Sequence, residues 1–538
     1  MNDPRSPKYL PTEIWNIILA FATPELPDCE DIVEASQTTI TPPASFLASR
    51  SSLFHLCLMS KRLDVLARPF LFQTIVIWEA DSLLLLWQSL KSCSDLGRYI
   101  LQMACWVPLT REAVVQEMVD LAKKKLEHSP LNRNLYQNLI TQHNVPQLVL
   151  FDILCRSTQL TMLSLLVPRS REGIQYSALM AMITENRQLN DTSATPTTLG
   201  HGQGHGISCS LASIQLCLDR HLSAALMRRE EGEQDEQDMG FDHQDYWPLL
   251  RTSKIIRLHC YGDDASFNLW FQLEEDMEED VEDDGSIGPG PPPEGYLGTV
   301  QEIRLDASSS GPKSLYYLCR HAHQLQALRV IHRRHSQDSF VSGSTTKTLD
   351  SGLLMRASTL RHLHLDFYDS VECKSHIGPD GRLASLPQFH HLETLHIQLQ
   401  TLFGRISAIS RLDVGDMFPS SLAELTLDDQ WLQDVVETEE RIKMYSGQID
   451  PEDFQGGWIM GYGMTEAGFW NSYRKGILKM LIRLCDVLAE RLPDLRRVHY
   501  VSDFWSRRGW ERNNSFDEVQ ESFCERGIEF YAGEKAEM

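Results

Sequence analysis

Hydrophobic residues recur along most of the chain in one short pattern, in which an apolar residue is followed three and five positions later by two more. The last two alternate with polar residues, so they lie on one side of a short strand, while the first turns inward from the approach to it. KIIRLHC is a degenerate copy. The pattern predicts a series of strands, whose copies begin at Leu160, Leu211, Val300, Leu325, Leu360, Leu392, Leu422 and Leu495.

Helix-like runs lie between the copies, among them SLYYLCRHAHQL, SGLLMRAST and LFGRISAISRL. A strand, a turn and a helix repeated in this way are similar to the leucine-rich repeat. Copies between Val300 and Leu422 begin roughly 25 to 35 residues apart, against about 20 to 29 in regular repeats. We therefore expect an α/β fold with an irregular leucine-rich-repeat solenoid and long loops, and an ordinary doubly wound α/β domain is the alternative.

The repeat region is expected to span residues 76–538, with disordered polar insertions near 189–207, 228–246 and 272–298. The last insertion carries the acidic run EEDMEEDVEDD, which is either a solvated tether or a docking strip for a basic partner. From about residue 465 a C-terminal cap is expected. There, RKGILKMLIRLCDVLAE predicts an amphipathic helix, and SFDEVQESFCERGIEFYAG predicts a further helix and a closing strand.

The pattern near the start is helical instead, in LPTEIWNIILAF and SLFHLCLMSKRLDVLARPFLF. Ile14, Ile17, Ile18 and Phe21 form one apolar stripe of the first helix, yet its other side is also apolar. A helix this short cannot be covered on both sides by its own hairpin, so a partner is expected on one face.

The second helix of the hairpin is expected to begin near Ser52 and to end near Ala67 or Arg68, because Pro69 cannot continue it. The acidic, proline-bearing stretch 22–50 between the two helices is interpreted as an inserted loop. Residues 1–75 would then form a small helical domain.

These two segments resemble the F-box, which begins with Leu-Pro-x-Glu-Ile and closes with a leucine-rich helix, a basic turn and a proline. The matching residues are Leu10, Pro11, Glu13, Ile14, Ile17 and Ile18, then Leu56, Leu58, Met59, Ser60, Lys61, Arg62, Leu63, Leu66, Ala67 and Pro69. Met59, Leu63 and the insertion depart from the family pattern. A plain amphipathic hairpin that caps a core is the alternative.

The resemblance implies the substrate-recognition subunit of a Skp-cullin-F-box (SCF) ubiquitin ligase, a non-catalytic adaptor in ubiquitin-dependent protein degradation. The F-box would bind the Skp-type adaptor and, through it, a cullin, while the repeats would hold a target protein. The alternative is a non-catalytic leucine-rich-repeat scaffold that uses the hairpin for assembly only. The adaptor-binding residues would be Leu10, Pro11, Ile14, Ile17, Ile18, Leu56, Leu58 and Met59, and positions beside the strands would bind the target: His362, His364, Asp366, His396, Gln398, Thr426 and Asp428.

A formal net charge of -24 argues against nucleic acid or an anionic membrane as the main partner, because phosphate binding needs concentrated Lys and Arg. No stretch of about 18 uncharged apolar residues occurs, and the first residues contain no apolar signal-peptide core. The 12 cysteines are scattered without a CxxC pair, which favours reduced thiols over a disulfide frame or a zinc module. We expect a cytoplasmic or nuclear protein.

Catalytic signals are weak. His201 and His205 are four residues apart, but flanking glycines disfavour the helix that would align them on a metal. The chain has no P-loop, no GxSxG turn and no HExxH motif. The sequence therefore predicts no metal, no cofactor and no active site.

Overall fold

A computed structural model gives the fold of the chain. The structure describes residues 10–27, 42–106, 119–120, 123, 145–168, 179–180, 182–184, 210–219, 246–252, 255–262, 295–308, 312–332, 346–366, 383–403, 417–428, 466–502 and 516–533.

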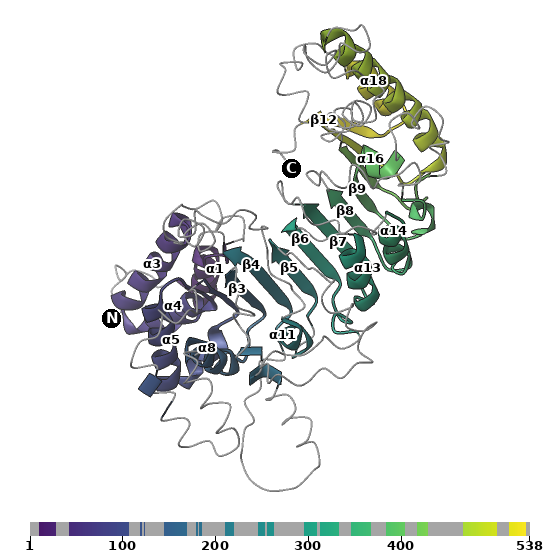
Figure 1. The fold of residues 1–538 in the computed structure, drawn as a ribbon. Coiled ribbons are helices and arrows are strands. Elements are labelled where there is room, and N and C mark those ends of the chain that lie inside the picture. Colours follow the sequence, from purple (N-terminus) through teal and green to yellow (C-terminus); the bar gives the residue numbers. More distant parts are fainter. Residues whose placement is uncertain are drawn as a thin grey trace, which may run out of the picture. The chain divides into compact units, whose positions relative to one another are not determined.

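The described residues form a mixed α/β fold with a twelve-stranded sheet, in which every pairing given in register is parallel. The strand order follows the chain order, without the reversal of order that defines a doubly wound sheet. Each predicted strand is confirmed (Figure 1). The strands are β1 (Thr74–Ile77), β2 (Gln102–Cys105), β3 (Met162–Pro168), β4 (Ser213–Asp219), β5 (Arg257–Tyr261), β6 (Glu302–Ser308), β7 (Ala327–His332), β8 (His362–Asp366), β9 (Thr394–Gln398), β10 (Glu424–Asp428), β11 (Arg497–Val501) and β12 (Glu529–Gly533).

The chain divides into two compact units. The first contains β1 to β5, and the second contains β6 to β12. The helices of the first unit are α1 (Thr12–Ala22), α3 (Ala44–Met59), α4 (Lys61–Gln73), α5 (Ala80–Ser92), the 3₁₀ helix η1 (Ser94–Tyr99), α8 (Val145–Arg156) and α11 (Trp247–Thr252). Those of the second unit are α13 (Pro312–His321), α14 (Thr346–Leu354), the 3₁₀ helix η5 (Leu386–Gln388), α16 (Leu399–Phe403), α18 (Glu466–Arg491) and α20 (Asp517–Cys524).

The first unit buries apolar side chains on both faces of β1 to β4. Ile75 and Ile77 alternate with Val76 along β1, and all three are buried. Val76 belongs to a cluster on the face opposite Ile75 and Ile77, together with Phe46 of α3. The cluster consists of Phe46, Val76, Ala104, Trp106, Leu166 and Cys217, with Leu26, Trp78 and Tyr261 packed against it.

The second unit buries one face of its strands and leaves the other polar. In β8, Leu363 and Leu365 are buried while His362 is exposed, and β9, β10 and β11 repeat this alternation. Helices α13 and α14 lie together on one side of the strands (Figure 1). A Cβ at Gly352 would stand only 2.6 Å from the Tyr316 Cα, so glycine permits this close helix packing.

The predicted C-terminal helices and closing strand are confirmed as α18, α20 and β12. Along α18 the expected apolar positions Ile477, Met480, Leu481, Leu484 and Leu488 are buried, and Val487 is half-buried. Phe523 of α20 stacks on Phe530 of β12, with ring centroids 5.0 Å apart. These contacts complete the core at the last strand.

The predicted loop 22–50 is wrong at both ends. Ala22 belongs to α1, and α3 begins at Ala44, which is eight residues before the expected start at Ser52. Phe46 explains the earlier start, because its buried side chain packs against Val76 and Trp106 and so holds the first turn of the helix.

The predicted helix end near Ala67 or Arg68 is also wrong, since α4 continues through Pro69 to Gln73. A proline in a helix costs about 3 kcal/mol. Phe70 and Leu71, which follow it, pack with Leu19, Leu53 and Ala67, and this burial offsets the cost.

The three predicted insertions lie outside the described residues, apart from Tyr246 and residues 295–298. In the part of the chain that the structure describes, no helix is long and apolar enough to cross a membrane. Among the described cysteines, Cys319 is buried, so that its pKa rises to about 12. Cys217, in contrast to our expectation of reduced thiols, is disulfide-bonded.

Candidate protein interfaces

Helices α1, α3 and α4 pack around a small buried interior. Leu19, Leu53 and Ala67, one residue from each helix, are fully buried there. The Ser60 hydroxyl accepts the backbone N–H of Leu63 at 3.2 Å and caps the start of α4. The cluster buries Leu19, whereas the stripe of Ile14, Ile17, Ile18 and Phe21 on α1 is exposed.

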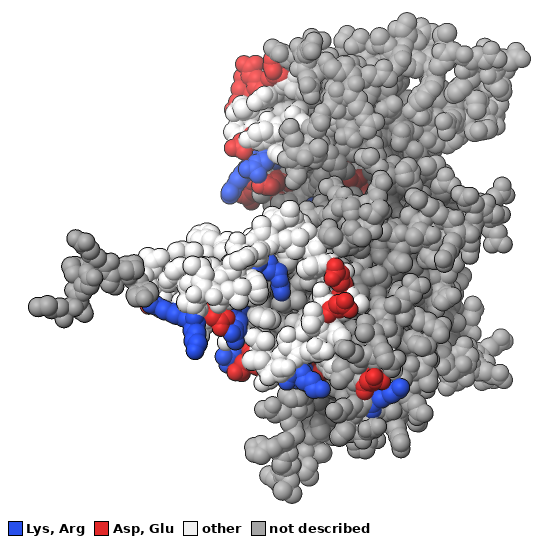
Figure 2. Space-filling model, turned by 90° about the vertical axis from the view of Figure 1, so that its left-hand side faces the viewer, with Lys and Arg blue, Asp and Glu red and all other residues white. Residues whose placement is uncertain are grey.

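Ten large apolar side chains are exposed on these three helices and at Leu10, which directly precedes Pro11. We call these ten residues the apolar helix face. They are Leu10, Ile14, Ile17, Ile18 and Phe21, then Leu47, Phe54, Leu58 and Met59 of α3, and Val65 of α4. Phe21 is 88% exposed and Met59 is 71% exposed. Figure 2 views the side on which these helices lie in Figure 1, and the described surface at its centre is largely uncharged.

The positions matched to the F-box divide between this face and the interior. Leu10, Pro11, Ile14, Ile17, Ile18, Leu58 and Met59 are exposed, whereas Leu56 is half-buried against the helix interior. Phe54, Leu47 and Val65 were not among the predicted contacts, although they are exposed on the same helices. The helical period of α3 alone could have indicated Phe54 and Leu47, which lie seven residues apart.

The second candidate interface lies on the outward side of the last five strands, and we call it the strand face. It comprises His362, His364, Thr394, His396, Glu424, Thr426, Arg497, His499, Glu529 and Tyr531, all exposed or half-buried. The register places these residues side by side in two rows, one beginning at His362 and one at His364. Parallel pairing therefore brings together residues that are far apart in the chain.

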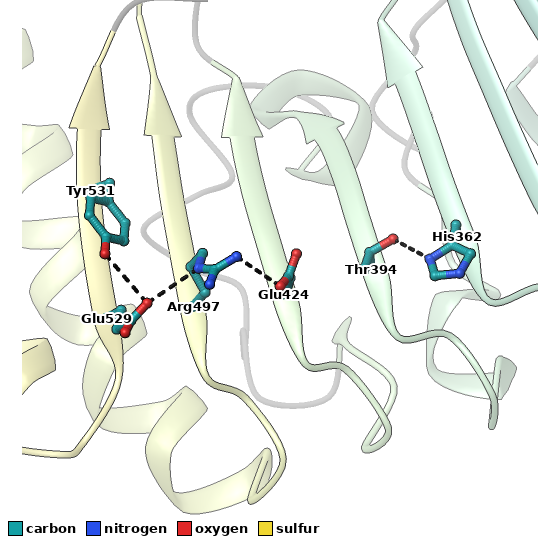
Figure 3. Close-up of polar contacts among 6 residues, drawn as sticks. All are labelled: His362, Thr394, Glu424, Arg497, Glu529 and Tyr531. Atoms are coloured by element: carbon teal, nitrogen blue, oxygen red, sulfur yellow. Dashed lines mark hydrogen bonds and ion pairs between the residues drawn. The ribbon is translucent and has the colours of Figure 1, made fainter. Parts of the chain in front are cut away.

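The first row, together with Tyr531 of the second row, makes two separate sets of polar contacts across the strands (Figure 3). Arg497 donates to Glu424 at 2.9 Å and to Glu529 at 3.3 Å. The Tyr531 hydroxyl donates to Glu529 at 3.4 Å, and His362 is hydrogen-bonded to Thr394 at 2.9 Å. Two exposed carboxylates thus share one guanidinium.

The second row consists largely of rings. His364 and His396 stack with centroids 3.8 Å apart, and His499 meets Tyr531 edge to face at 5.1 Å. Burial lowers the pKa of His499, and the nearby Arg497 lowers it further, because both disfavour the positively charged form of the ring. His499 is therefore neutral near pH 7.

The predicted target-binding residues differ in accessibility. His362 is exposed, and His364, His396 and Thr426 are half-buried on the strand face. Asp366, Gln398 and Asp428 are buried at the ends of their strands. Gln398 donates to Asp366 at 3.1 Å, and a carboxylate oxygen of Asp428 lies 3.8 Å from the His396 Nε2.

Several strand-face residues were not predicted, namely Thr394, Glu424, Arg497, His499, Glu529 and Tyr531. The signal was present in the sequence, because each of them stands beside or between the apolar residues of a strand pattern, as His362 and His364 do. Applying the same alternation to β11 and β12 finds Arg497, His499, Glu529 and Tyr531.

Among the described residues, no group of three or more His, Cys, Asp or Glu side chains is arranged to hold a metal ion. No protein-family model matches the chain, and no curated protein matches it significantly. The two surfaces are therefore the features from which a function is inferred.

Proposed function

We propose that this chain is the substrate-recognition subunit of a Skp-cullin-F-box type ubiquitin ligase. In this proposal the apolar helix face binds the Skp-type adaptor, and the strand face of an irregular leucine-rich-repeat solenoid binds a target protein. The exposure of ten large apolar side chains on helices whose sequence resembles the F-box carries the proposal.

The exposed apolar surface argues for a protein partner at the helices. Monomeric proteins rarely leave large contiguous apolar patches in water, and such patches usually mark interaction sites. A specific interface buries about 800 Å² on each partner, with apolar anchors near its centre. Ile17 and Leu58, which are 54% and 68% exposed, are suitable anchors from two different helices.

The chain would then act by proximity. One surface would hold the adaptor and, through it, the cullin, and the other would hold the target, so that target lysines reach a charged ubiquitin-conjugating enzyme at high effective concentration. This mechanism needs no catalytic residue or cofactor from the chain itself. It also places the chain's role in the cytoplasm or the nucleus.

The test is a pull-down of the tagged full chain from the lysate of the source cell, probed for the Skp-type adaptor and the cullin. The variant Ile17→Asp with Leu58→Asp introduces two charges into the apolar helix face and should reduce adaptor capture at least about tenfold. Leu85→Asp is the matched control, because Leu85 is 62% exposed on α5 outside that face. It should leave capture unchanged.

Equal adaptor capture by the double variant and the control would contradict the proposal. Adaptor capture without any cullin would instead favour a non-catalytic interaction scaffold that uses the helices only for assembly. Circular dichroism of both variants shows whether they retain the fold, which separates a lost contact from unfolding.

A further inference from the structure

We propose that the strand face binds a basic segment, rich in lysine or arginine, of the target protein. This inference rests on the proposed function for the role of that segment. The binding property itself is independent of the adaptor. It follows from the charge, the rings and the register of β8 to β12.

The charged side chains at outward positions of these five strands are mostly carboxylates. Glu424 and Glu529 are exposed, and both contact Arg497, the one guanidinium at an outward position of these strands. Asp366 and Asp428 stand at the outward positions that end β8 and β10. Because the carboxylates outnumber the guanidinium, the described strand face favours a cation over an anion.

The contacts of Arg497 leave negative charge on the exposed side. One guanidinium bridges two carboxylates, at 2.9 Å from Glu424 and 3.3 Å from Glu529. These side chains are about half exposed, so water screens each pair only in part. A second cation that approaches Glu424 or Glu529 would complete the charge balance.

The rings provide a second, independent reason to expect a long cationic side chain. Thr426 is the smallest residue of its row, and the stacked pair His364 and His396 lies on one side of it, with His499 and Tyr531 on the other. Strands are about 4.8 Å apart, so His396 and His499 stand roughly 10 Å from each other. That spacing admits one extended side chain above Thr426.

A lysine or arginine suits this position chemically. Its aliphatic stem can lie against the rings, while its charged end reaches Glu424, which precedes Thr426 by two residues on the same face. Tyr531 is 52% exposed and offers an aromatic face to a second cation. The row therefore combines apolar contact with negative charge.

Strands β6 and β7 set a limit to the basic segment. Arg304 and Arg329 stand at the corresponding outward positions, and both contact the buried Asp306, with Arg329 at 3.0 Å. Guanidiniums at these outward positions repel further cations. The segment should thus cover β8 to β12 and end before β7.

The test measures fluorescence anisotropy of a fluorescein-labelled oligolysine peptide with the purified full chain at low ionic strength. An oligoglutamate peptide of equal length serves as the control with the opposite charge. The wild-type chain should bind oligolysine and not oligoglutamate. Preference for oligoglutamate would overturn the inference.

The decisive variant is Glu424→Gln with Glu529→Gln, which removes two exposed charges from the strand face. It should weaken oligolysine binding about three- to tenfold, as expected for two exposed ion pairs. Glu518→Gln with Glu521→Gln is the matched control, because it removes the same charge from exposed positions of α20. An equal loss in both variants would show that oligolysine responds to the overall charge of the chain, and would overturn the inference.

Failure of this inference is distinguishable from failure of the proposed function. Glu424→Gln with Glu529→Gln should leave adaptor capture unchanged, and Ile17→Asp with Leu58→Asp should leave oligolysine binding unchanged. If only adaptor capture fails, the ligase function is wrong and the basic preference stands. If only oligolysine binding fails, the basic preference is wrong and the ligase function stands.

Discussion

The outward face of the strands is built differently in the two units. In the first unit it carries Val76, Ala104, Trp106 and Leu166, which are buried together with Phe46 of α3. In the second unit the outward face carries His362, Glu424, Arg497 and other polar side chains that water reaches. The strands of both units alternate in the same way and pair in parallel.

The difference shows that the same alternation along a strand is compatible with a covered outward face and with an exposed one. Apolar outward residues require a cover, and in the first unit Phe46 and Leu26 help to provide it. Polar outward residues need none, so they remain available to a partner. The residues that alternate with the repeated apolar positions therefore decide whether a strand face is covered or exposed.

The largest expected effect is on the stability of the covered face. Trp106→Ala should lower the free energy of unfolding by about 3–5 kcal/mol, because Trp106 is buried in the cluster with Phe46. His364→Ala, at a half-buried position of the strand face, should cost less than about 1 kcal/mol. Urea denaturation followed by circular dichroism measures both, and equal losses would erase the distinction between the two faces.

A similar contrast is expected within the single helix α3. Leu53→Ala should destabilise the first unit by about 2–5 kcal/mol, because Leu53 is fully buried between α1 and α4. Leu58→Ala should change stability by no more than about 0.5 kcal/mol, since Leu58 is exposed. The same denaturation experiment tests this pair. A large loss for Leu58→Ala would mean that the apolar helix face is part of the core.

A smaller effect is expected from the polar contacts of the strand face. Arg497→Ala should cost less than about 1 kcal/mol, because exposed ion pairs with Glu424 and Glu529 contribute little. A double-mutant cycle with Glu424→Ala isolates the pair. A coupling energy well above 1 kcal/mol would indicate a structural role for this face instead of a binding role.

The smallest effect is a pH dependence of the second unit. His499 has a lowered pKa in the folded chain, so below its ordinary value of about 6.5 the unfolded chain binds the proton first. Stability should therefore fall as the pH is lowered through this range. His499→Gln should reduce that dependence in thermal unfolding at pH 7 and pH 5.5. An unchanged slope would contradict the assignment to His499.

Parts of both candidate interfaces could be predicted from the sequence. The spacing of Ile14, Ile17 and Ile18 already predicted an apolar stripe that needs a partner, and the stripe is exposed. The alternation in HLHLD placed His362 and His364 on the outward side of a strand. In each case a local period decides which residues share a face.

Other features could not be predicted because they depend on contacts between distant segments. The start of α3 at Ala44 depends on Phe46 meeting Val76 and Trp106, and the continuation of α4 past Pro69 depends on Phe70 meeting Leu19. Local rules favoured a loop and a helix end at these positions. Burial outweighed those local preferences.

The sequence by itself determined where the strands and the apolar stripe lie, because these follow from periods of a few residues. Only the tertiary structure decided which residues become neighbours across strands, such as Glu424 and Arg497, which are 73 positions apart. It also decided that Asp366 and Asp428 are buried while Glu424 is exposed, although all three are acidic residues of strands. The physical reason is that burial and pairing depend on what the rest of the chain brings to each position.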